Sequence, residues 1–71
     1  MSDTTRTLAD ALPEEIARVR TVLGYFKEIG PAGMLGAAFI EQDLLEADKA
    51  AMSGDIVRML RSLATLKEIN A

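Results

Sequence analysis

Two breaks divide this chain into segments with a helical repeat, and they constrain the fold more than any other feature. Gly30 is followed by Pro31, a pair that ends one helix and can begin the next, because proline lacks the amide hydrogen that a helix interior needs. The sequence Ser53-Gly54-Asp55 is typical of a glycine that ends a helix and an aspartate that caps the following one. No strand-like alternation of apolar residues accompanies these breaks, so the sequence predicts a small all-α domain of three helices.

Apolar spacing gives approximate bounds for each helix. We expect helices from about Pro13 to Ile29, from near Pro31 to about Ser53, and from Asp55 to Ile69. The connections are short, so neighbouring helices are expected to pack antiparallel, with the second and third forming a tight hairpin. Residues 1–12 are expected to be a flexible N-terminal segment ahead of a three-helix domain over residues 13–71.

The first half of the second helix is apolar nearly all round, which indicates burial on more than one side. Its expected apolar contacts include Met34, Leu35, Ala38, Phe39, Leu45 and Met52. With 49% hydrophobic residues and a middle helix expected to be longer than its neighbours, the chain is predicted to form a homodimer.

The glycine-rich run "GPAGMLGAAFI" at residues 30–40 raises three alternatives. A dinucleotide fingerprint needs a preceding strand and a P-loop needs a following Lys-Ser/Thr pair, and neither is present. A membrane span needs roughly 20 apolar residues, so the run is too short. Close helix packing remains, because Gly33, Gly36 and Ala37 let another backbone approach. The partner is either the first helix, which we favour because Tyr25 and Phe26 need a neighbour, or the same run in a second chain.

The amino-acid composition excludes several kinds of catalytic and ligand chemistry. The chain has no cysteine and no histidine, so disulfides, thiolate ligands and imidazole ligands or bases are all excluded. No serine, threonine or lysine lies beside a plausible activating base. We therefore predict no enzymatic activity and no catalytic residue, metal, cofactor or small-molecule substrate. The N-terminus has no signal-peptide pattern, so a cytoplasmic protein is expected.

Acidic residues gather in the second half of the second helix. They are either a solvated face or a surface for a basic partner. With the apolar run, they make up the candidate protein-contact residues: Gly33, Met34, Gly36, Ala37, Ile40, Glu41, Asp43, Glu46 and Asp48.

The basic residues support an alternative hypothesis. A dimer could bring Arg18, Arg20, Arg58 and Arg61 together as a small nucleic-acid regulator. Nucleic acid is the less favoured partner, because the net charge is −3 and a single tyrosine offers little base stacking. Arg58 and Arg61 are also placed to pair with the acidic helix of the same or another molecule.

The pattern "EEIARVRTVLGYFKEIGPAGMLGAAFIEQDLLEADKAAMSGDIVRMLRSLATLKEI", from Glu14 to Ile69, is similar to small helical proteins of tailed phages and prophages. That group carries over no site residues. The resemblance implies a protein that works by binding another, as yet unidentified, protein in the host cytoplasm, as an accessory factor, a regulator or an inhibitor of host defence.

Overall fold

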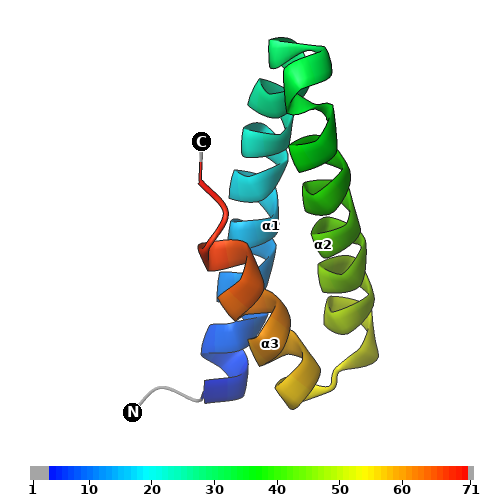
Figure 1. Ribbon diagram of the computed structural model, residues 1–71. Helices are drawn as coiled ribbons and strands as arrows, with labels where there is room; N and C mark the ends of the chain where they lie inside the picture. Colours follow the sequence, from blue (N-terminus) through cyan, green and yellow to red (C-terminus); the bar gives the residue numbers. More distant parts are fainter. Residues whose placement is uncertain (1–3, 71) are drawn as a thin grey trace.

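The computed structural model describes residues 4–70, with side chains from residue 8 onward. Its elements are the helix α1 (Thr4–Ile29), the 3₁₀ turn η1 (Pro31–Gly33), and the helices α2 (Met34–Ser53) and α3 (Ile56–Lys67). The helices α1 and α2 form a long antiparallel hairpin, and α3 packs along one end of it (Figure 1). Residues 4–70 contain no strand, and the all-α fold with an α2–α3 hairpin is confirmed.

The predicted start of the first helix at Pro13 is wrong. The helix α1 begins at Thr4, and Leu8 and Leu12 are 3% and 0% exposed in the core. An interior proline costs a helix about 3 kcal/mol, whereas burying two leucines stabilises the fold by about 1.5–3 kcal/mol each. The burial of these leucines therefore offsets the free-energy cost of the proline. Residues 4–12, which were expected to be flexible, belong to the helical domain. Residues 1–3 lie outside the described residues.

The core is a narrow apolar layer between the three helices. Its large side chains come mainly from α1, while α2 contributes two fully buried alanines, Ala47 and Ala50, where the helices approach closely. The buried cluster consists of Leu8, Leu12, Ile16, Val19, Val22, Ile40, Leu44, Ala47, Ala50, Met59 and Leu66.

The connection from α2 to α3 forms as predicted. Gly54 takes a left-handed conformation with φ 71°, which lets the chain leave α2 without steric cost. The carboxylate of Asp55 then accepts a hydrogen bond from the backbone amide of Arg58 at 3.2 Å, which caps α3.

Within one chain, α2 is buried on one side only, and not on more than one side as expected. Only the face with Ala37, Ile40 and Leu44 is buried in its first half. The other expected contacts are exposed by half or more: Met34, Leu35, Phe39, Leu45 and Met52. The physical reason is the length of the helices, because α1 is the longest at 26 residues and α3 has only 12, so α3 cannot follow α2 to its far end.

The molecule is elongated, with extents of 45 × 20 × 15 Å and a radius of gyration of 12.9 Å. A compact domain of this length is expected to have a radius near 11 Å. Of the helices within residues 4–70, none combines the length and the apolar character that crossing a membrane requires.

Candidate functional site

The α1–α2 hairpin presents one face to α3, and particular contacts define it. On α1, Arg18 donates hydrogen bonds to the carbonyl oxygens of Leu66 and Ile69, at the end of α3. On α2, Glu46 pairs with Arg58 of α3 at 2.9 Å. These contacts mark the side of each helix on which α3 lies.

The same face continues beyond α3 as an apolar surface. Tyr25 and Ile29 follow Arg18 by seven and eleven residues, spacings that return to the same side of a helix. Phe39 and Leu35 precede Glu46 by the same two intervals on α2. Their exposed fractions are 52% for Tyr25, 61% for Ile29, 65% for Phe39 and 71% for Leu35. We call these four residues the uncovered surface.

Helix lengths explain why this surface is bare. At 1.5 Å per residue, α2 is about 30 Å long and α3 about 18 Å, which leaves roughly 12 Å of the hairpin without a third helix. Figure 1 shows α3 beside the part of the hairpin away from the η1 turn, and the segment after α3 runs on along α1 without forming a helix. Tyr25 and Ile29 are not among the contact residues predicted from the sequence. The sequence feature that could have indicated them is the short third apolar segment, because a short third helix cannot cover the full length of the other two.

Phe26 and two glycines join the helices beneath the uncovered surface. A Cβ atom on Gly36 would lie 2.8 Å from two carbons of the Phe26 ring, and a Cβ atom on Gly33 would overlap the backbone oxygen of Phe26. Both glycines therefore allow a close approach of α1 and α2. The favoured interpretation of the glycine-rich run, packing on the first helix of the same chain, is confirmed for these two positions.

The predicted protein-contact residues from the apolar run divide into two groups. Gly33, Ala37 and Ile40 are buried against the rest of the chain, and Gly36 is covered in part by the Phe26 ring. These residues pack within the chain, because α1 already occupies that side of α2. Met34 is 59% exposed and remains accessible.

The predicted acidic contact residues lie mostly within ion pairs of the same chain. Lys27 pairs with Glu41 at 3.7 Å, and Arg20 pairs with Asp48 at 3.3 Å. Glu46 accepts a hydrogen bond from Arg58, which holds the pKa of this carboxyl below its usual value. Exposed pairs such as these are worth only about 0–1 kcal/mol, so they orient the side chains more than they stabilise the fold.

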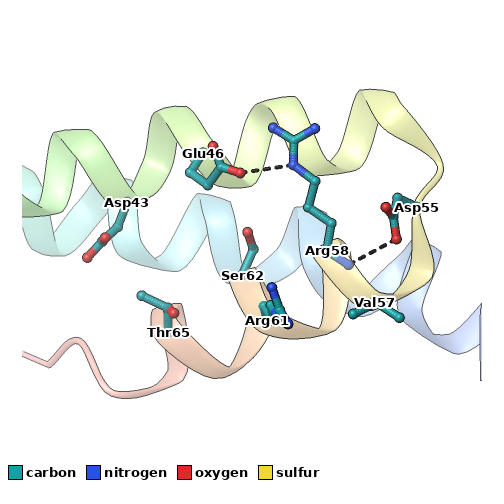
Figure 2. A pocket seen from close by; sticks show the side chains of 8 residues that line it. All are labelled: Asp43, Glu46, Asp55, Val57, Arg58, Arg61, Ser62 and Thr65. Carbon is teal, nitrogen blue, oxygen red and sulfur yellow. Dashed lines mark hydrogen bonds and ion pairs between the residues drawn. The ribbon is translucent and has the colours of Figure 1, made fainter.

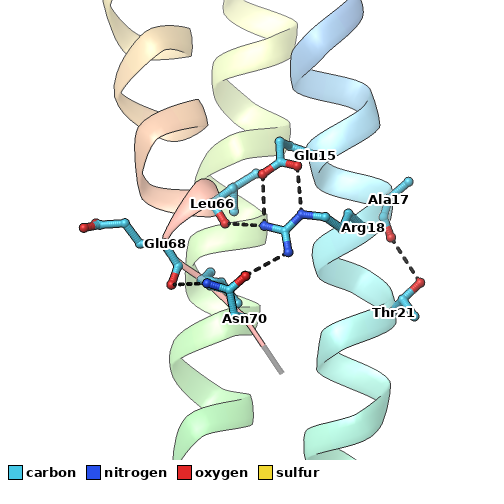
Figure 3. Close-up of polar contacts among 8 residues, drawn as sticks. Glu15, Ala17, Arg18, Thr21, Leu66, Glu68 and Asn70 are labelled. Carbon is cyan, nitrogen blue, oxygen red and sulfur yellow. Dashed lines mark hydrogen bonds and ion pairs between the residues drawn. The ribbon is translucent and has the colours of Figure 1, made fainter.

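Arg18 has a structural role at the end of α3 (Figure 3). Its guanidinium donates to both carboxylate oxygens of Glu15, at 2.8 and 3.0 Å, and to the carbonyl oxygens of Leu66 and Ile69, at 2.8 and 2.9 Å. The Leu66 carbonyl also accepts from the backbone amide of Ile69, which lies two residues beyond α3, and a cation at the C-terminal end of a helix is favourable. The hydrogen bond with Arg18 lowers the pKa of Glu15.

The four arginines of the nucleic-acid hypothesis are thus not gathered into one basic face. Arg18 holds the end of α3, while Arg20 and Arg58 pair with carboxylates of α2. Arg61 lines an open groove between α2 and α3.

Polar and charged residues of both signs make up most of the lining of that groove (Figure 2). The side chain of Arg58 reaches across the groove to Glu46. Asp55, whose carboxylate caps α3, lies at one end of the groove. Its lining consists of Asp43, Glu46, Asp55, Val57, Arg58, Arg61, Ser62 and Thr65. Within the part of the chain that the structure describes, no group of acidic side chains is close enough to hold a metal ion.

Comparison of the chain with protein families, with curated proteins and with solved structures finds no match.

Proposed function

We propose that this protein is a non-enzymatic interaction module that binds another protein chain through the uncovered surface. The observation that carries the proposal is a set of four exposed apolar side chains, Tyr25, Ile29, Leu35 and Phe39, which helical spacing places on the α3 side of the hairpin beyond the end of α3. Single exposed apolar residues are common in proteins, whereas an apolar patch of several hundred Å² is among the largest that a monomer exposes and is often functional.

The size of this surface suits a contact of moderate strength. From their exposed fractions, the four side chains present roughly 400 Å² to solvent, taking about 150–200 Å² for a fully exposed large side chain. Burial of that area contributes about 10 kcal/mol, against an association cost of about 4–15 kcal/mol. The partner therefore has to bring a complementary apolar surface, and a helix placed where a longer α3 would lie meets that need.

Charge favours an apolar partner surface at this place. No charged residue occurs between Ile29 and Ile40, and the nearby Lys27 and Glu41 neutralise one another. The acidic half of α2 is a less direct candidate, because three of its carboxylates already have basic partners in the chain. The resemblance to small phage and prophage proteins supports a phage-encoded accessory, regulatory or host-defence-inhibiting role in the host cytoplasm.

Site-specific photo-crosslinking in the source cells tests the proposal. A photo-reactive phenylalanine analogue replaces Phe39 in one variant and Met52 in a control. Met52 is a matched position, since it is also an exposed apolar residue of α2 but lies at the opposite end of the helix. We expect a protein adduct from position 39 that position 52 does not form. Equal or absent crosslinking at the two positions would overturn the proposed function.

A further inference from the structure

We infer that the chain covering the uncovered surface is a second copy of this protein, so that two hairpin ends pack together as a four-helix bundle. This inference rests on the proposed function and names its partner. Three observations carry it: the total surface area, the area of the apolar face, and the distribution of charge around it.

The total surface is larger than a monomer of this size needs. The protein exposes 4912 Å², whereas a folded monomer of 7.7 kDa is expected to expose about 4,300 Å². The excess of roughly 600 Å² lies at the lower end of the ~600–1,000 Å² that each partner buries in a specific interface. The elongated shape accompanies this excess, because α3 does not extend to the η1 end of the hairpin.

The apolar face alone nearly supplies such an interface when it is present twice. Two copies contribute roughly 800 Å² from Tyr25, Ile29, Leu35 and Phe39, before the rim is counted. Met34, which is 59% exposed beside them, extends the apolar area toward the η1 turn. The sum approaches the lower limit of about 1,200 Å² for a specific complex.

The charge distribution favours self-association at this end over the rest of α2. Two copies of a chain with net charge −3 repel one another, yet the contact area from Ile29 to Ile40 contains no charged residue. The other exposed apolar residues of α2, Leu45 and Met52, lie among Glu41, Glu46 and Asp48 along the helix. An identical copy there would have to pack against these charged side chains and Lys49, and the three carboxylates already have basic partners in their own chain.

The experiment measures molar mass by light scattering during gel filtration, from about 1 µM to about 1 mM, with Phe39→Glu and the matched control Met52→Glu. Both variants add one carboxylate to an exposed apolar position of α2, so both are expected to keep the helical content of the wild type by circular dichroism. We expect a wild-type dimer, a dissociation constant raised more than about 100-fold by Phe39→Glu, and a change within about threefold for Met52→Glu.

A second variant keeps the inference falsifiable if Phe39→Glu fails to fold. Ile29→Gln changes the other helix of the same surface and is expected to weaken the dimer as well. The inference is overturned if the wild type is a monomer throughout, or if Met52→Glu dissociates the dimer as strongly as Phe39→Glu. The proposed function is tested separately by the crosslinked mass at position 39. An adduct of twice the chain mass identifies a second copy. An adduct of another mass identifies a different protein, which rejects the second copy as the partner but is consistent with the proposed function.

Discussion

Replacement of Gly33 by alanine should destabilise the fold, whereas the same change at Gly24 should stabilise it. A Cβ atom on Gly33 would overlap the backbone oxygen of Phe26, which cannot move without opening the contact between α1 and η1. Such overpacking costs about 1–3 kcal/mol. A Cβ atom on Gly24 meets no atom within 4 Å, and alanine is favoured over glycine in a helix interior by about 1 kcal/mol.

The two variants should therefore differ by about 2–4 kcal/mol. For a domain of this size, 1 kcal/mol shifts Tm by about 4–8 °C, so their melting temperatures should be at least about 8 °C apart. The assay is thermal unfolding followed by far-UV circular dichroism, at one low protein concentration so that association does not contribute. A Gly33→Ala variant that melts at or above the wild-type temperature would refute close packing of η1 on α1. If Gly33 instead contacted a second chain, its substitution would change association and leave Tm of the dilute protein unchanged.

Three further predictions concern the core and the two ends of α3. Leu12→Ala should lower the free energy of unfolding in urea by about 2–5 kcal/mol, because Leu12 is 0% exposed. A loss below about 1 kcal/mol would place Leu12 outside the core. Asp55→Ala should cost about 1 kcal/mol in the same assay, since it removes the cap on the Arg58 amide, and an unchanged midpoint would refute the capping role. Arg18→Gln should lower Tm and flatten the acid limb of the stability curve. The folded pKa of Glu15 lies below its unfolded value. The pair with Arg18 therefore contributes stability at pH values above the unfolded pKa, and this contribution is lost as pH falls through the folded pKa. The same loss of stability at acidic pH in the wild type and the variant would contradict this role.

The turn between α2 and α3 could be predicted from the sequence because its causes are local. Gly54 has no side chain to oppose a left-handed conformation, and Asp55 caps a helix that starts at the next residue. The N-terminal part of α1 could not be predicted in this way. Proline is common at the first position of a helix, so Pro13 was interpreted as a start, and only the packing of Leu8 and Leu12 in the assembled core overrides that local preference.

The candidate site follows from the difference in length between α3 and the α1–α2 hairpin, and not from a sequence motif. The apolar character of Leu35 and Phe39 is evident in the sequence, but whether they are buried depends on how far α3 extends along the hairpin. The role of Arg18 was equally out of reach, because its acceptors are carbonyl oxygens of Leu66 and Ile69, about fifty residues away along the chain. Such partners become neighbours only through the tertiary fold.

The central claim is that a second copy covers the uncovered surface, and a dilution series of two-dimensional amide NMR spectra tests it most directly. As the protein is concentrated, the amide signals of Tyr25, Ile29, Leu35 and Phe39 should shift together along one binding curve. The signal of Met52, at the opposite end of α2, should stay in place. Spectra that do not change with concentration, or shifts confined to the region of Met52, would contradict the claim.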